Sequence, residues 1–153
     1  MNLTEIIKNN IRIDDIVFNC IVEINTLYPE FHFEVQFTPD NFNEQILQIK
    51  ANEPLIKQGI LNLLMNAVHY SNNHKAKITF DASSDKLTFI ISNSGKTLSE
   101  DEQRFIFTHF FRGNNAQNHQ GFGLGLVLAQ RIFVVHDAII KYHSNKHIGN
   151  IFS

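Results

Sequence analysis

The 153-residue chain has one cysteine (Cys20), no tryptophan, three prolines and no excess of positive charge. A single cysteine excludes an internal disulfide framework and any metal site built from several thiolates, and it fits a reducing compartment best. No apolar run approaches the ~20 residues of a membrane-spanning helix, and residues 1–4 do not resemble a signal peptide. A formal net charge of -2 argues against a nucleic-acid-binding surface.

The residues that are present indicate an ordinary globular domain. Hydrophobic residues make up 43% of the chain, and 14 phenylalanines supply material for one core. A chain of this length fits a single domain, since domains cluster around ~100–150 residues.

Hydrophobic periodicity predicts alternating helices and strands. Helices are expected over residues 14–27, 54–70 and 124–136, and strands over 31–37, 46–50, 78–80 and 86–92, with two more near the C-terminus. Asp14 or Asp15 is expected to cap the first helix, and residues 2–12 to form a short helix or the end of a longer one. Residues 95–121 lack strong periodicity apart from a Phe-rich stretch, which is typical of a functional lid.

The helix predicted over residues 54–70 is apolar nearly all round, which indicates burial. One stripe is polar, at helical spacing: Asn62, Asn66, His69 and Tyr70. Buried amides need partners, and an amide oxygen is a suitable ligand for Mg²⁺ that already carries phosphate oxygens and waters. The alternative is that both asparagines bond only neighbouring backbone or water.

A glycine-rich motif opens into the last predicted helix. It consists of Gly121, Phe122, Gly123, Leu124, Gly125 and Leu126. Alternating glycines let backbone N–H groups approach a ligand, and the positive end of the helix dipole favours an anion such as phosphate. A flexible hinge is the alternative interpretation. The motif is not the dinucleotide-binding fingerprint, because its glycine spacing differs and because polar coil rather than a strand precedes it.

Four motifs in this order resemble the ATP-binding catalytic domain of bacterial sensor histidine kinases, in the superfamily shared with DNA gyrase. They are the asparagine box at 61–71, the first glycine box at 91–95, the phenylalanine box at 106–112 and the second glycine box at 121–126. The resemblance covers residues 52–153, and residues 14–50 fit the weaker N-terminal part of such domains.

The resemblance implies ATP and Mg²⁺ as cofactors and assigns roles by position. Asn66 would coordinate Mg²⁺, and Asn62 occupies the position where hydrolytic relatives carry a glutamate base. Asn93 and Gly95 would contact the adenine side, while Tyr70 and the lid would border the nucleotide. The second glycine box, residues 121–126, would wrap the phosphates. Arg112 would contact phosphate or a partner domain, or be an ordinary surface arginine.

This chain departs from the family pattern at three places. His69 stands where a lysine or arginine commonly reaches the phosphates. Asn93 replaces the aspartate that accepts the adenine amino group, and Thr97 replaces the second glycine of that box. The usual His-Gly-Gly after the last helix reads His136-Asp137-Ala138. An asparagine can accept through its oxygen or donate through its nitrogen, so ATP is expected to bind about tenfold more weakly than with aspartate and GTP to be excluded less strictly.

The resemblance implies an α+β fold of the Bergerat type: a two-layer α/β sandwich with a mixed sheet of about five strands and three helices on one face. Residues 1–13 are expected to be the tail of an upstream dimerisation helix, and residues 14–153 the catalytic domain.

The implied activity is transfer of the ATP γ-phosphoryl group to a histidine. No segment resembles the acceptor sequence, so the acceptor is expected on an upstream dimerisation domain and the isolated chain is not expected to phosphorylate itself. The expected partners are that domain and the receiver domain of a response regulator, with no nucleic acid. The full-length protein is expected to be a homodimer and this fragment a monomer. The domain is expected to lie on the cytoplasmic side of a sensor protein that could be anchored in a membrane. The alternative is a degenerate docking module without turnover.

Overall fold

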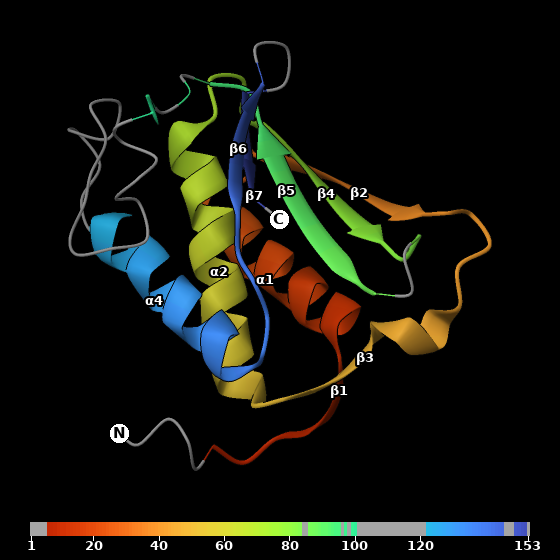
Figure 1. Cartoon of the computed structure of the whole chain (residues 1–153). Coiled ribbons are helices and arrows are strands. Elements are labelled where there is room, and N and C mark those ends of the chain that lie inside the picture. Colours follow the sequence, from red (N-terminus) through yellow and green to blue (C-terminus); the bar gives the residue numbers. More distant parts are fainter. Residues whose placement is uncertain are drawn as a thin grey trace.

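A mixed five-stranded sheet forms one layer of the molecule (Figure 1). The computed structural model describes residues 6–83, 86–95, 97, 99–100, 122–145 and 149–152. The strands lie in the spatial order β2 (His32–Thr38), β4 (Lys75–Asp81), β5 (Thr88–Asn93), β7 (Gly149–Phe152) and β6 (Tyr142–Asn145). Among the described strand pairs of this sheet only β2–β4 is parallel, and β4 and β5 form an antiparallel hairpin.

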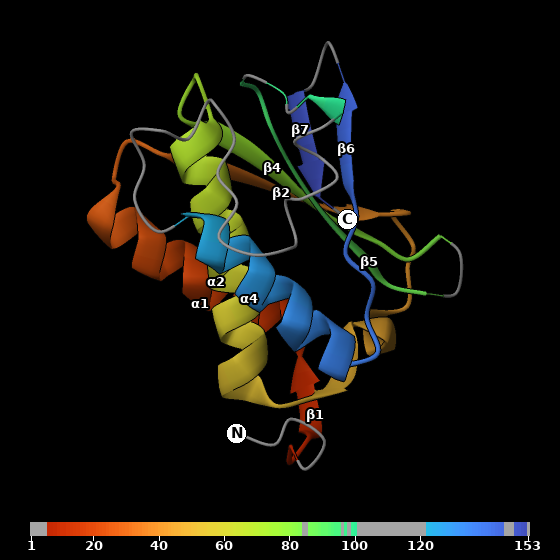
Figure 2. The same cartoon turned by 60° about the vertical axis from the view of Figure 1, so that its left-hand side comes forward.

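Three helices of the described residues cover one face of this sheet (Figures 1 and 2). They are α1 (Ile13–Leu27), α2 (Glu53–Tyr70) and α4 (Phe122–Val135), with α2 between the other two. The two-layer α+β sandwich expected from the sequence is therefore confirmed. None of the helices within the described ranges is long and apolar enough to cross a membrane.

Side chains from both layers meet in one core. Phe80, Ile78 and Ile91 of the sheet are almost wholly buried, as are Ile60 and Leu64 of α2. The alternating apolar residues of the central strands point toward the helices, because successive strand residues face opposite sides of a sheet. The middle helix α2 therefore packs against the sheet and its helical neighbours with one face buried, while Leu61, Met65 and Val68 of its second apolar side are only partly buried.

Helix α2 begins where the sequence predicts. Asn52 is its N-cap, and its side-chain oxygen accepts a hydrogen bond from the backbone N–H of Leu55 at 3.1 Å. Pro54 lies in the first turn, where a missing N–H costs no helical hydrogen bond. The helix ends at Tyr70, and Ser71 takes extended backbone angles.

The N-terminal segment departs from the expected helix. Residues Asn9–Arg12 form strand β1, which pairs antiparallel with β3 (Gln48–Ala51) after the short 3₁₀ helix η2 (Glu44–Leu47). The prediction of helix is wrong for residues 9–12, because pairing with a strand about forty residues later decides their conformation. The strand expected over 46–50 begins two residues later than predicted.

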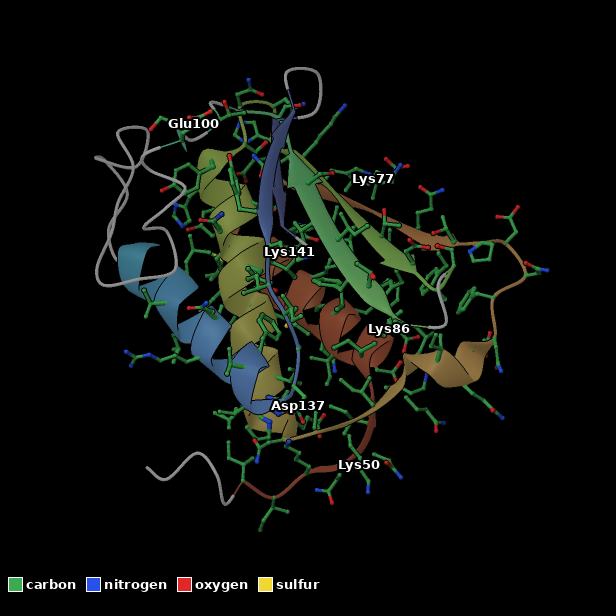
Figure 3. All side chains as sticks on the ribbon, viewed as in Figure 1. Lys50, Lys77, Lys86, Glu100, Asp137 and Lys141 are labelled. Atoms are coloured by element: carbon green, nitrogen blue, oxygen red, sulfur yellow. The ribbon has the colours of Figure 1, made fainter. Side chains whose placement is uncertain are left out.

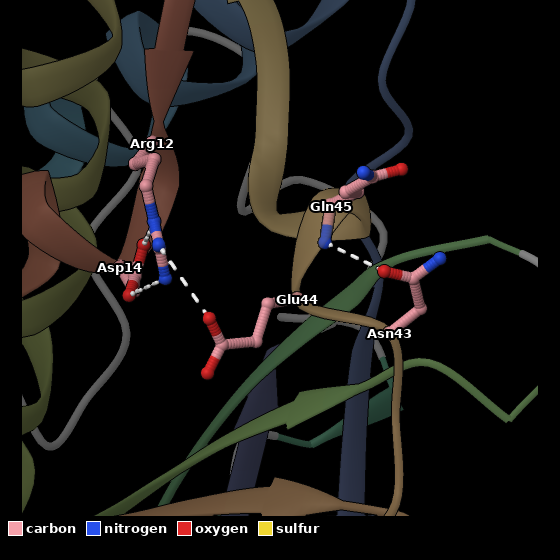
Figure 4. Close-up of polar contacts among 5 residues, drawn as sticks. All are labelled: Arg12, Asp14, Asn43, Glu44 and Gln45. Carbon is pink, nitrogen blue, oxygen red and sulfur yellow. Dashed lines mark hydrogen bonds and ion pairs between the residues drawn. The ribbon is translucent and has the colours of Figure 1, made fainter.

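The start of α1 also differs. Its N-cap is Arg12, which makes no side-chain cap, and Asp14 lies inside the first turn rather than at the cap. The buried Asp14 carboxylate accepts two hydrogen bonds from Arg12, with Nε···Oδ1 3.0 Å and Nη2···Oδ2 2.8 Å (Figure 4). A carboxylate there still complements the helix dipole, so the predicted acidic helix start is right and the predicted capping residue is wrong.

Candidate functional site

Asn62, the first residue of the polar stripe of α2, faces the first turns of α4. The two helices run antiparallel, as Figure 1 shows, and the side-chain nitrogen of Asn62 donates to the carbonyl oxygen of Gly125 at 3.2 Å. The Asn62 oxygen accepts from the side-chain amide of Gln58, one turn earlier on α2, at 2.9 Å. Both ends of the Asn62 amide are therefore engaged, and its nitrogen holds α4 against α2.

Asn66 lies one turn beyond Asn62 on the same face of α2. It is 3% exposed, and its side-chain oxygen has no hydrogen-bond partner among the described residues. A buried polar atom without a partner costs roughly 1–3 kcal/mol. Because α4 runs antiparallel to α2, the step from Asn62 to Asn66 leads toward the start of α4.

Residues 122–126 of the second glycine box are part of α4 rather than a loop before it. The helix begins at Phe122, two residues earlier than the predicted start at Leu124. The glycines at 123 and 125 therefore lie inside the first turn of the helix. A Cβ at Gly125 would lie 3.9 and 4.0 Å from the nearest Asn62 atoms, so the helix passes α2 there without strain.

Gly59 lets α2 and α4 approach closely near the C-terminal half of α4. A Cβ at Gly59 of α2 would lie 3.2 Å from Cζ of Phe133 and 3.3 Å from Cγ2 of Ile132. Both partners belong to the C-terminal half of α4. The helices therefore touch along most of their shared length, which brings the N-terminus of α4 to the level of the asparagines. The first N–H groups of such a helix have no intrahelical partner and can bind an anion.

The end of β5 meets the end of α2 at the other side of the site. Asn93 is 4% exposed, and its side-chain nitrogen donates to the carbonyl oxygen of Ser94 at 3.1 Å. The same carbonyl accepts from the backbone N–H of Asn72 at 3.0 Å. A Cβ at Gly95 would overlap the carbonyl oxygen of Tyr70, so only glycine fits this approach. Asn93 and Gly95 are thus brought to the C-terminal end of the polar stripe.

The stripe does not face one neighbour along its whole length. The ring of His69 meets the ring of Tyr28, just after α1, edge to face with centroids 6.2 Å apart. Asn62 instead faces α4. Part of the predicted site lies outside the described residues: Arg112, Gly121 and most of the lid. Of Phe122, Gly123 and Leu124 only the backbone is described.

Two hydrogen-bonding residues of the α2–α4 pair were not predicted, one beside Asn62 and one at the far end of α4. Gln58 precedes Asn62 by one helical turn, and this spacing was a usable signal. His136 accepts a hydrogen bond from the backbone N–H of Asn52 at 3.1 Å, across 84 residues of sequence. No local sequence pattern predicts a contact between residues so far apart in the chain.

The family comparison decides how this arrangement is classified. The model of the family described as histidine kinase-, DNA gyrase B- and HSP90-like ATPases matches residues 51–153, which include α2, β5 and α4. The chain belongs to this family. The resemblance that the four motifs indicate is therefore confirmed, and the chain is an ATP-binding domain.

The curated relatives of the chain include sensor histidine kinases. The chain is 28% identical over 141 residues to the heme sensor protein HssS of Staphylococcus saprophyticus, and the aligned part is 92% of this chain. It is also 28% identical over 145 residues to the signal transduction histidine-protein kinase ArlS of Staphylococcus aureus, which covers 93% of it. The chain spans 30% and 31% of the length of these two relatives.

Solved structures show the same fold. The catalytic domain of histidine kinase ThkA superposes with a TM-score of 0.73 at 22% identity, over 95% of this chain and 92% of that one. The mycobacterial sensor histidine kinase MprB gives a TM-score of 0.75 at 17% identity, over 95% and 93%. At such identities the likeness concerns the fold.

Proposed function

We propose that the chain binds ATP together with Mg²⁺ where α2 meets the start of α4, as the phosphoryl-donating domain of a sensor histidine kinase. The observation that carries the proposal is the buried side-chain oxygen of Asn66, which has no partner among the described residues. A neutral amide oxygen in that position suits Mg²⁺ that receives its other ligands from phosphates and water. Within the described ranges no three His, Cys, Asp or Glu side chains gather into a metal cluster, so the ion would depend on the nucleotide for its binding.

The neighbouring groups fit the remaining parts of ATP. The start of α4 offers backbone N–H groups and the positive end of a helix dipole to the phosphates. Asn93 would meet the adenine amino group, since its nitrogen is bound to Ser94 and its oxygen remains as an acceptor. Gly95 and Tyr70 would border the base. Arg112 and Gly121 keep the phosphate roles that the resemblance implies.

Asn62 supports transfer to a protein acceptor over hydrolysis. Its amide is neutral and both of its ends are bound, to Gln58 and to Gly125. Such a group cannot take a proton from an attacking water at neutral pH, whereas a carboxylate could. Phosphoryl transfer mainly requires positioning and charge neutralisation, which a domain without a covalent nucleophile can provide. The acceptor histidine would lie on a dimerisation domain that precedes this segment in a longer, homodimeric protein, and a receiver domain would take the phosphoryl group next. That longer protein would hold the domain at the cytoplasmic side.

Calorimetric titration with ATP tests the binding step. The unmutated chain is expected to bind in the presence of Mg²⁺ and more weakly in EDTA. Asn66→Leu should remove this difference. Asn43→Leu is the matched control, because Asn43 is an exposed asparagine that caps η2 (Figure 4) and takes no part in the α2–α4 contacts, and it should keep the difference.

A phosphotransfer assay tests the kinase step. ATP labelled at the γ-phosphate should leave no acid-labile label on this chain alone, and supplying the dimerisation helices should produce label on them. Equal ATP affinity with and without Mg²⁺ would refute the metal site. ATP binding without transfer to any supplied acceptor would favour a docking module.

A further inference from the structure

His136 connects the two helices of the nucleotide site at the end remote from the nucleotide. It follows the last residue of α4, and its Nε2 accepts from the backbone N–H of Asn52, the N-cap of α2, at 3.1 Å. Its Nδ1 lies 2.7 Å from the carbonyl oxygen of Ile132, one turn earlier on α4. Figure 3 labels Asp137, which follows His136, and Lys50, two residues before Asn52, and both lie at the same end of the molecule.

These two contacts determine the tautomer of the ring. A backbone N–H can only donate, so Nε2 must be unprotonated to accept from Asn52. A carbonyl oxygen can only accept, so Nδ1 must carry the proton and donate it to Ile132. The link therefore requires neutral His136 in its Nδ1–H form.

The position of this link along the helices matters more than its strength. Asn62 holds Gly125 near the start of α4, and Asn52 holds His136 just past its end. The two attachment points are about 15 Å apart along α2 and about 17 Å apart along α4, so they match in an antiparallel pair. Between them, Gly59 leaves close contact with Phe133 and Ile132. With an attachment at each end, α4 cannot slide along α2.

We infer that His136 is a positioning residue for nucleotide binding, because it fixes the axial register of α4 on α2 and so holds the phosphate-binding start of α4 level with Asn66. This inference rests on the proposed function, and it extends the site to a residue at the opposite end of α4. Losing the link frees α4 to shift toward or away from Asn66 while the β5 side of the site keeps its own contacts with Asn72 and Tyr70.

The test compares ATP with adenosine, which lacks the phosphates and reports only on the β5 side. Both affinities are measured by NMR chemical-shift titration, which reaches millimolar dissociation constants. His136→Leu should weaken ATP binding by roughly five- to tenfold, the effect of one lost hydrogen bond, and leave adenosine binding unchanged. His136→Gln, whose side-chain oxygen can replace Nε2 as acceptor, should recover most of the ATP affinity.

Asn52→Ser is the matched control. Serine keeps the N-cap and the backbone N–H that His136 accepts from, and it removes only the side-chain bond from Asn52 to the carbonyl oxygen of Ile7. Its ATP-to-adenosine affinity ratio should equal that of the unmutated chain. A simple loss of stability would lower the melting temperature without changing this ratio.

Each contrary outcome has one meaning. Binding of both ligands by the unmutated chain, with an unchanged ratio in His136→Leu, overturns the positioning role alone. A chain that binds neither ligand overturns the proposed function and this inference with it. Nitrogen-15 spectra of His136 provide a check independent of any nucleotide: they should show the Nδ1–H tautomer, and a protonated Nε2 would overturn the link itself.

Discussion

Gly95 lies directly against the carbonyl oxygen of Tyr70, where the end of β5 meets the end of α2. A side chain at position 95 would overlap that backbone oxygen, which cannot rotate away as a side chain could. Gly95→Ala should therefore displace the Asn93–Gly95 segment and destabilise the fold by roughly 1–3 kcal/mol. Thermal unfolding measures the loss, and a melting temperature within a degree of the unmutated chain would contradict this packing.

Gly125→Ala is the contrasting change. The added methyl group would meet Asn62 only at 3.9 and 4.0 Å, which is ordinary contact. Alanine inside a helix is favoured over glycine by about 0.8–1 kcal/mol, so the melting temperature should rise. ATP binding should weaken, because the methyl group lies in the first turn of α4. A gain in stability with unchanged ATP affinity would place the phosphates elsewhere.

Asn66→Leu should stabilise the nucleotide-free chain. Leucine has the same branched arrangement of four side-chain heavy atoms and leaves no polar atom unpaired at a position that is only 3% exposed. Removing an unsatisfied buried group should raise the free energy of unfolding by roughly 1–3 kcal/mol. At this chain length, each kcal/mol should raise the melting temperature by about 2–4 °C. A lower melting temperature than that of the unmutated chain would show that the Asn66 oxygen has a partner in the folded protein.

Asn93 should select ATP over GTP. Its side-chain nitrogen is bound to the Ser94 carbonyl, so the oxygen is the group offered to the base. Adenine presents a donor there and guanine a carbonyl oxygen, which an acceptor repels. Asn93→Leu should weaken ATP binding about tenfold, the equivalent of ~1.4 kcal/mol, and should abolish the preference for ATP. Calorimetric titration with both nucleotides measures it, and equal affinities in the unmutated chain would mean that the amide is turned the other way.

Asp137→Gly should stabilise the end of α4. Asp137 has φ 57°, a left-handed conformation, and the Ala138 N–H bonds the carbonyl oxygen of Phe133 at 2.8 Å in the manner of a Schellman motif. Glycine adopts this conformation without the steric cost of a Cβ, and the gain should be about 1 kcal/mol. Ala138→Gly, at the next position, should give no gain. An unchanged melting temperature for Asp137→Gly would mean that the aspartate fits there without strain.

Cys20 should react with thiol reagents only when the chain unfolds. It is fully buried on α1, and burial raises the pKa of its thiol from 9.0 to about 11. The neutral thiol therefore favours the fold up to about pH 9, and its contribution is lost as the pH rises through 11, because the unfolded thiol ionises first. Labelling kinetics with a chromogenic disulfide at pH 8 should follow the unfolding rate, and rapid labelling of the folded chain would contradict the burial.

Local signals in the sequence were enough to place several elements. The apolar residues of 54–70 and the position of Pro54 located α2, and the short apolar runs at 78–80 and 86–92 located strands β4 and β5. The order of the four motifs sufficed to indicate the family. These signals are strong because burial of one face imposes a period on the residues that form it.

Other features depend on contacts between segments that lie far apart in the sequence. Strand β1 exists because β3 pairs with it, and the first turns of α4 continue through the glycines because Asn62 supports Gly125. The link between Asn52 and His136 spans 84 residues and leaves no local trace in the sequence. The unpaired oxygen of Asn66 is likewise a property of the packed molecule, because only the surrounding side chains determine whether a buried atom finds a partner.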